Sequence, residues 1–223
     1  IGVVLFVGPT GVGKTELARA LAQVYFQSPE AFVRLDMSEF SDESAVIKLI
    51  GGAGFEGLLT SPVRTRPFVL LLLDEFEKAS DAARNLFLSV FDEGRLTDGE
   101  GHLVDFKNTI IIATSNAGSL EIQQAAQAKT DYATICVKLT SEILPKVFRP
   151  ELLNRFDVVI VFKILTEQAT APIQVVQDQS KRRPADDSRI VGDNSLIQRM
   201  GYAPHYTFRQ TVVDTLEYWR HEL

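Results

Sequence analysis

The sequence of 223 residues predicts an α/β fold, a doubly wound and mostly parallel sheet followed by a small helical domain. Short, unbroken apolar runs are typical of parallel strands covered on both faces. These runs alternate with amphipathic segments, which indicates the doubly wound arrangement. After Lys163 no strong apolar strand follows. We therefore predict an α/β domain at 1–163 and a small, mainly helical lid domain at 164–223.

The predicted strands are the apolar runs at 3–7, 32–35, 68–73, 109–114 and 158–162. Two helices are predicted where apolar residues recur at helical spacing. In the helix at 15–26 the shared face consists of Leu17, Leu21, Val24 and Tyr25. In the helix at 82–91 it consists of Ala83, Leu86, Phe87 and Val90. Further helices are expected at 167–180, 193–200 and 208–220.

Composition excludes several classes of protein. The net charge of −6 argues against a nucleic-acid-binding surface, which needs clustered Lys and Arg. No apolar run approaches the roughly 18 residues of a membrane span. The single cysteine, Cys136, forbids an internal disulfide and suits a reducing, cytoplasmic compartment. The apolar start is expected to be a core strand of a longer protein. The histidines lack metal-ligand spacing and are expected at the surface: His102, His205 and His221.

The most specific motif is a P-loop between the first strand and the first helix. Its glycines allow backbone N–H groups to turn inward around phosphates. Lys14 is expected to reach the β- and γ-phosphates, and the Thr15 hydroxyl to bind Mg²⁺. The alternative, an ordinary glycine-rich turn, lacks the flanking strand and helix. ATP and Mg²⁺ are therefore the predicted cofactors, and the predicted nucleotide-binding residues are Gly8, Pro9, Thr10, Gly11, Val12, Gly13, Lys14 and Thr15.

Two acids follow the apolar run at 68–73 directly. In P-loop enzymes an acid at this strand end holds the water shell of Mg²⁺, the role expected of Asp74. The adjacent Glu75 is placed to deprotonate the attacking water as a general base. The alternative is that Asp74 caps the helix that follows.

Polar residues also follow later strands. Asn116 ends the run at 109–114, at the sheet edge where ligands bind, and it is predicted to touch the γ-phosphate or its water. Its alternative role is to start a turn.

Arg149 and Arg155 lie just before the last strand, where an arginine can act on the nucleotide of a neighbouring subunit. From spacing alone, the alternative of surface salt bridges is favoured for both arginines.

Together the motifs resemble the AAA+ module of Clp-type unfoldases, most closely the second ATPase ring of ClpB- and ClpC-like proteins. The resemblance covers residues 1 to about 162 densely. Besides the P-loop it rests on 34–40 (RLDMSEF), 72–79 (LLDEFEKA), 92–99 (DEGRLTDG), 113–116 (ATSN) and 148–157 (FRPELLNRFD).

The resemblance implies roles for three residues. Asn116 matches the sensor-1 position, and Arg155 matches the arginine finger that reaches into the next subunit of a hexameric ring. The segment Gly201-Tyr202-Ala203-Pro204 resembles the start of the sensor-2 motif, which places sensor 2 at Arg209. Such rings hydrolyse ATP to pull unfolded polypeptide through a central pore. The implied partners are thus further copies of the chain and unfolded polypeptides, with no nucleic acid or membrane.

The sequence also departs from the family. The Gly-Tyr-Val-Gly pore loop is absent, and in the shorter interval 51–57 the only aromatic residue is Phe55. We predict Phe55 as the pore residue on an exposed, mobile loop; the alternative is a core residue. Thr207-Phe208 replaces the usual Gly-Ala before sensor 2. No peptidase-docking tripeptide occurs between 118 and 147, so a protease partner is not supported.

These observations predict an ATP-hydrolysing module that couples hydrolysis to protein unfolding or disaggregation. The shortened pore interval favours the alternative, a nucleotide-gated assembly module that does little threading. A small-molecule kinase fits the P-loop, but not the acid pair or the arginines.

Overall fold

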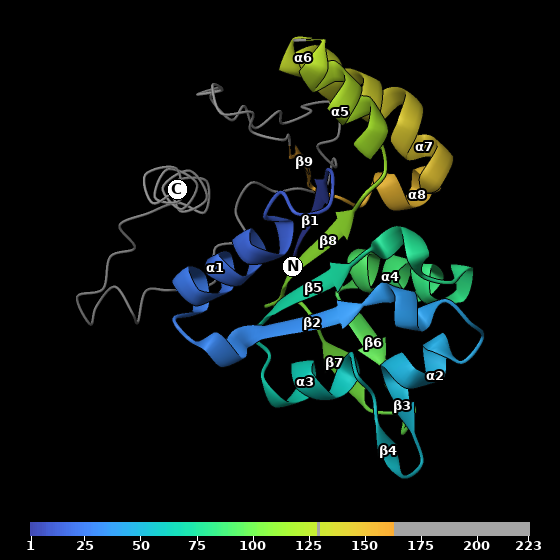
Figure 1. The fold of residues 1–223 in the computed structure, drawn as a ribbon. Helices are drawn as coiled ribbons and strands as arrows, with labels where there is room; N and C mark the ends of the chain where they lie inside the picture. Colours follow the sequence, from blue (N-terminus) through green and yellow to red (C-terminus); the bar gives the residue numbers. More distant parts are fainter. Residues whose placement is uncertain (129, 163–223) are drawn as a thin grey trace. The chain divides into compact units, whose positions relative to one another are not determined.

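The computed structural model describes residues 1–128 and 130–162. Within them, five parallel strands form a sheet in the order β2-β5-β8-β1-β9 (Figure 1). The predicted doubly wound α/β architecture is confirmed. The predicted helical domain at 164–223, its three helices and Arg209 lie outside the described residues. The strands are β1 Gly2–Val7, β2 Phe32–Asp36, β5 Leu70–Asp74, β8 Ile110–Ser115 and β9 Val158–Val161.

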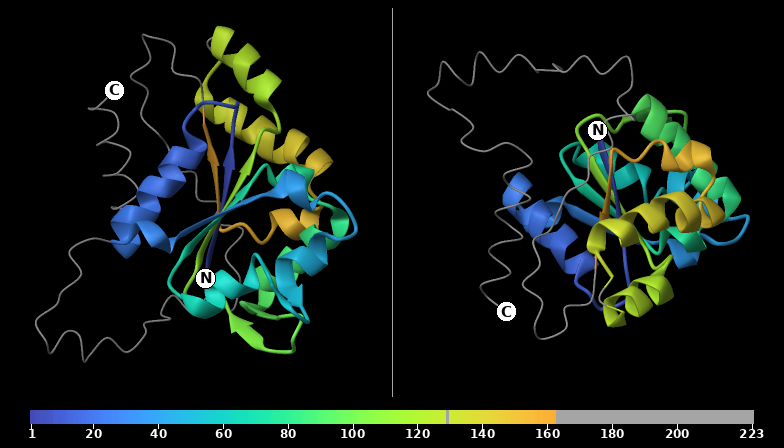
Figure 2. Two further views of the ribbon diagram at one scale, coloured as in Figure 1. Left: turned by 60° about the horizontal axis from the view of Figure 1, so that its bottom comes forward. Right: turned by 90° about the horizontal axis from the view of Figure 1, so that it is seen from above.

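Helices cover both faces of this sheet (Figure 2). Helix α1 (Lys14–Phe26) lies against one face, and α4 (Asp81–Glu93) lies on the opposite side. The other α-helices are α2 Ala45–Ile50, α3 Thr60–Thr65, α5 Ser119–Gln127, α6 Tyr132–Lys138, α7 Leu144–Val147 and α8 Pro150–Leu153. A π-helical turn at Leu139–Ile143 joins α6 to α7, and 3₁₀ turns lie at Pro29–Ala31, Met37–Phe40 and Phe76–Lys78. None of the helices in the described ranges is long and apolar enough to cross a membrane.

Two small antiparallel hairpins lie outside the main sheet. The first pairs β3 (Gly51–Gly52) with β4 (Phe55–Glu56), and the second pairs β6 (Arg95–Thr97) with β7 (Leu103–Asp105). The sequence did not predict either, because strands of two or three residues carry too little alternation to be recognised.

The core on the α4 side of the sheet is rich in phenylalanine. Phe76, the second residue after β5, is fully buried, and its ring centroid lies 5.6 Å from that of Phe87 in α4 and 5.9 Å from that of Phe148. Phe156, which precedes β9, packs 5.7 Å from Phe91 of α4. Aromatic pairs at these distances add to the stabilisation from buried area. They fix α4 and the segment between α8 and β9 against each other.

Two details of the predicted packing were wrong. Phe68 was expected in the buried strand, but it is 61% exposed and β5 begins at Leu70. Val24 and Tyr25 were expected on the buried face of α1, yet about half of each residue's surface is exposed. Tyr25 packs instead edge-on against Phe26, at 4.9 Å between ring centroids. Helical spacing marks a face of a helix, but it does not show how far along that face the sheet extends.

Candidate active site

The site lies where three neighbouring strands end. The parallel register pairs Val7 with Ser115 and Leu73 with Ala113, so β1, β8 and β5 end at one edge of the sheet. The P-loop follows β1, Glu75 follows β5, and Asn116 follows β8. The structure thus brings together residues that the sequence predicted separately, at the edge where open α/β sheets bind ligands.

The P-loop backbone needs glycine at three positions. Gly11 and Gly13 have φ angles of +81° and +92°, in the left-handed region that side chains rarely adopt. Gly13 caps the N-terminus of α1, where the first backbone N–H groups have no partner within the helix. At Gly8, an added Cβ would lie 2.6 Å from the carbonyl oxygen of Phe162. A loop of this shape at a helix N-terminus suits a phosphate group.

Lys14 lies at the centre of the site. Its Nζ donates hydrogen bonds to the carbonyl oxygens of Gly8 (2.6 Å) and Pro9 (2.8 Å) and to Oδ1 of Asn116 (2.9 Å). The side chain is buried, and burial lowers the pKa of its ammonium group. The negative charges of nearby carboxylates act in the opposite direction and raise this pKa; they belong to Asp74, Glu77 and Glu75.

Asn116 connects this cation to the predicted base. Its Nδ2 donates to Oε1 of Glu75 at 3.2 Å, while its backbone N–H donates to Oε1 of Glu77 at 2.9 Å. Its carbonyl oxygen also accepts from the backbone N–H of Ser119 at 3.2 Å, so Asn116 starts a turn as well. The turn is therefore observed, while the contact of Asn116 with the γ-phosphate or its water stays a prediction.

Glu75 has an unusual backbone conformation. Its φ and ψ angles are 55° and 50°, the left-handed region that non-glycine residues enter at an energetic cost. Its backbone N–H donates to Oγ1 of Thr114 at 3.0 Å. Strained residues of this kind occur preferentially at functional sites, where the surrounding structure holds them in place.

Asp74 is buried between two donors. Its Oδ1 accepts from the hydroxyl of Thr114 at 2.5 Å, and its Oδ2 accepts from Arg34, at 2.9 Å from Nε and 2.7 Å from Nη2. Asp74 does not cap the following helix, because the N-cap of α4 is Ser80, whose hydroxyl accepts from the N–H of Ala83. The capping alternative is therefore wrong.

The predicted magnesium ligands have suitable chemistry. Mg²⁺ prefers oxygen ligands and is usually held by one or two carboxylates together with phosphates and water. Asp74 offers a carboxylate at the sheet edge, and Thr15 offers a hydroxyl in the first turn of α1, where it is half-buried. These residues fit ATP with Mg²⁺.

Sequence reasoning missed three members of this network, Arg34, Thr114 and Glu77. Arg34 is a charged residue inside the β2 run, and Thr114 is a polar residue inside the β8 run. A polar residue within a strand of a buried sheet indicates that a hydrogen-bond or ion-pair partner lies beside it. Glu77 stood beside the acid pair without an assigned role, and only the fold places it against the Asn116 amide.

The arginine pair contacts α4. Arg155 forms an ion pair with Asp92, and Arg149 forms one with Asp81 at 3.4 Å and donates to Oδ1 of Asn85. Within the described ranges, neither guanidinium has a polar contact with the P-loop. Both alternatives for Arg155 stay open, since a finger that acts on a neighbouring subunit would also lie away from its own P-loop.

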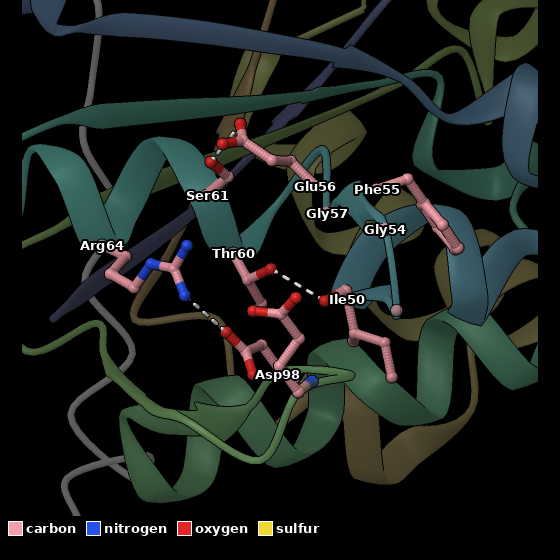
Figure 3. A pocket seen from close by; sticks show the side chains of 11 residues that line it. Ile50, Gly54, Phe55, Glu56, Gly57, Thr60, Ser61, Arg64 and Asp98 are labelled. Carbon is pink, nitrogen blue, oxygen red and sulfur yellow. Dashed lines mark hydrogen bonds and ion pairs between the residues drawn. The ribbon is translucent and has the colours of Figure 1, made fainter.

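Phe55 lies on β4 (Figure 3). The residue is 49% exposed. Its predicted exposure is confirmed, and the alternative of a core residue is wrong. The glycine-rich segment was expected to be a loop, but it forms the β3–β4 hairpin, in which Gly52 lies against the Phe55 ring. Beside this hairpin is a cavity of about 200 Å³, where Arg64 of α3 donates to Oδ2 of Asp98 at 3.0 Å.

His102 is exposed, as predicted. The ligand atoms of Asp98, Glu100 and His102 lie within 4.8 Å of one another. However, Glu100 and His102 are exposed, and Arg64 binds Asp98 and lies 3.2 Å from Nδ1 of His102. We assign no metal there. Cys136 is a half-buried free thiol, and burial raises the pKa of this thiol. We assign it no chemistry. His205 and His221 lie outside the described residues.

Comparison with known proteins gives the family. Residues 1–159 match the model of the AAA domain (Cdc48 subfamily). The chain is 43% identical to the chaperone protein ClpB of Meiothermus ruber, 46% to ClpB 1 of a Synechocystis species and 44% to ClpB of Vibrio cholerae, each over 220 residues. These alignments cover 94% of this chain but only 24% to 26% of the relatives, so the chain spans about a quarter of their length. The resemblance to Clp-type modules is confirmed, and the chain belongs to the AAA domain family (Cdc48 subfamily).

Proposed function

We propose that this chain binds ATP with Mg²⁺ and hydrolyses it. Family membership implies nucleotide binding. The observation that carries the catalytic proposal is the connected set Lys14–Asn116–Glu75, which joins a cation, an amide and a carboxylate at one sheet edge. A phosphate-binding lysine beside a potential general base is the arrangement that phosphoryl transfer to water requires.

Each residue then has a defined task. The P-loop amides and Lys14 bind the phosphates, while Thr15 and Asp74 hold Mg²⁺, which neutralises developing charge on the phosphate oxygens. Glu75 accepts the proton of the attacking water. Asn116 orients that water and the Glu75 carboxylate through its side-chain amide.

We further propose that the chain works in a homo-oligomer, a hexameric ring as in the family it resembles. In that ring Arg155 acts on the ATP of the neighbouring subunit, and Arg209 contacts phosphate as sensor 2. The similarity to proteins named ClpB supports this proposal. The position of Arg155 beside α4 is compatible with it.

The work driven by hydrolysis is proposed to be the unfolding or disaggregation of polypeptides. Phe55 is the proposed grip, because an exposed aromatic offers a large apolar contact without demanding a specific partner. The competing function is a nucleotide-gated assembly module with little threading. The observation that favours it is the shortness of the β3–β4 hairpin, whose strands have two residues each.

Steady-state ATP turnover tests these proposals in one series. We expect turnover that requires Mg²⁺, rises more than linearly with chain concentration and increases when unfolded protein is added. Turnover that survives complete chelation of Mg²⁺ would contradict the proposed cofactor. If neither turnover nor assembly changes when unfolded protein is added, the assembly module is favoured. The mass of the protein in solution with and without ATP measures that assembly directly.

A further inference from the structure

The proposed finger, Arg155, is held by a carboxylate of its own chain. Its partner is Asp92, near the C-terminal end of α4, and the closest atoms of the pair are Nε of Arg155 and Oδ1 of Asp92. In the part of the chain that the structure describes, this ion pair is the one polar contact of the Arg155 side chain. A guanidinium group carries five N–H donors, more than one carboxylate accepts, so an arginine beside an aspartate retains donors for a phosphate.

The backbones on both sides of the pair are fixed. Phe91 and Phe156, which are the chain neighbours of the two charged residues, pack at 5.7 Å between ring centroids, and both are buried. The backbone N–H of Arg155 donates to the carbonyl oxygen of Leu152 at 3.1 Å. The backbone position of Arg155 is therefore determined by the core, while the end of its long side chain is determined by Asp92.

A second ion pair on the same face of α4 provides a comparison. Asp81 pairs with Arg149, and Asp81, Asn85, Leu88 and Asp92 recur at three- and four-residue intervals, which places them along one side of the helix. The side chains of Arg149 and Asp81 are 57% and 68% exposed, whereas those of Arg155 and Asp92 are 34% and 33% exposed. Exposed ion pairs contribute little because water and salt screen them. The pair at Arg155 is the better shielded of the two.

We propose that Asp92 is a positioning residue that orients the Arg155 guanidinium for the neighbouring subunit's nucleotide. This inference rests on the proposed trans role of Arg155. An unrestrained arginine side chain loses rotamer freedom when it docks. Asp92 imposes part of that order during folding, so the guanidinium is already placed when the neighbour's ATP reacts.

The test uses Asp92→Asn, which keeps the shape of the side chain and removes its charge. We expect kcat for ATP to fall by about 10- to 100-fold, the effect of misplacing a reacting group, while KM for ATP changes little. Asp92→Glu, which restores the charge on a longer stem, should recover part of the loss. Asp81→Asn is the matched control on the same helix face, and it should stay near the wild-type rate.

Mixing experiments assign the defect to one side of the interface. A subunit with Asp92→Asn keeps its own nucleotide site, so mixing it with Glu75→Gln, which keeps its finger, should restore turnover. Mixing Asp92→Asn with Arg155→Ala should not. Full activity in Arg155→Ala would remove the trans role itself. Loss of activity in Arg155→Ala, with unchanged or increased activity in Asp92→Asn, would overturn only the role of Asp92.

A readout independent of activity is the NMR signal of the Arg155 Nε–H group. The proposed restraint predicts a high NMR order parameter for this N–H bond in the wild type and a lower one in Asp92→Asn. Equal order parameters in both proteins would overturn the proposal.

Discussion

The Nζ atom of Lys14 donates a 2.9 Å hydrogen bond to Oδ1 of Asn116, a residue 102 positions later in the chain. The same Asn116 side chain donates from its Nδ2 to Glu75. One amide therefore fixes the distance between the cation that binds phosphate and the carboxylate that activates water.

Replacing Lys14 should weaken nucleotide binding. Lys14→Ala removes the cation that is expected to contact the β- and γ-phosphates, and hydrogen bonds to charged groups contribute about 1.5–3 kcal/mol each. We expect ATP affinity, measured by isothermal titration calorimetry, to fall by at least about tenfold. The control is Lys78→Ala, which removes an exposed lysine in the turn after β5. Equal affinity of Lys14→Ala and wild type would contradict the assignment.

The left-handed backbone of Glu75 should make glycine more stable than alanine at this position. Both Glu75→Gly and Glu75→Ala remove the carboxylate, but only glycine adopts a φ angle of 55° without steric strain. We expect Glu75→Gly to exceed Glu75→Ala in free energy of unfolding by about 1 kcal/mol, measured by urea denaturation. The reverse order would show that the strain is absent.

Gly8→Ala should distort the P-loop. Its Cβ would lie 2.6 Å from the carbonyl oxygen and 2.8 Å from the Cβ of Phe162, so the loop or the segment after β9 must shift. We expect a loss of about 1–3 kcal/mol of stability, the usual range for overpacking, together with weaker ATP binding. Gly2→Ala is the control, because an added Cβ there meets nothing within 4 Å. A melting temperature that changes equally little in both variants would refute the close contact.

Truncating Phe55 should leave the fold intact and reduce the response to polypeptide. The residue is half exposed, so Phe55→Ala should change the melting temperature only slightly, whereas Phe87→Ala at a fully buried position should lose about 3–5 kcal/mol. If Phe55 grips substrate, the stimulation of ATP turnover by unfolded protein should fall in Phe55→Ala and persist in Phe55→Tyr. Undiminished stimulation in Phe55→Ala would favour the assembly module.

The sequence predicted the main sheet and the residues at its edge well. The apolar runs that became β1, β5 and β8 are nearly continuous, so their positions and the polar residues after them follow from pattern alone. The glycines of the P-loop were recognisable because their spacing, followed by Lys14 and Thr15, is typical of a phosphate-binding loop.

Contacts between distant segments were not predictable in the same way. The hydrogen bonds of Arg34 and Thr114 to Asp74 depend on which strands are neighbours in the sheet. The strand order cannot be derived from the pattern of one sequence alone. The ion pair between Arg155 and Asp92 likewise depends on how α4 packs beside the segment before β9. The exposure of Phe68 depends on where the sheet ends, which local hydrophobicity does not reveal.

The most direct test of the central claim, ATP hydrolysis at this site, is the turnover rate of Glu75→Gln compared with wild type, with ATP binding measured on the same samples. Glutamine keeps the size of the side chain and an acceptor for the Asn116 amide, but it does not accept the proton of water. We expect that ATP still binds while turnover falls by about 10²–10⁴, the contribution of a general base. Turnover at the wild-type rate in Glu75→Gln would contradict this claim.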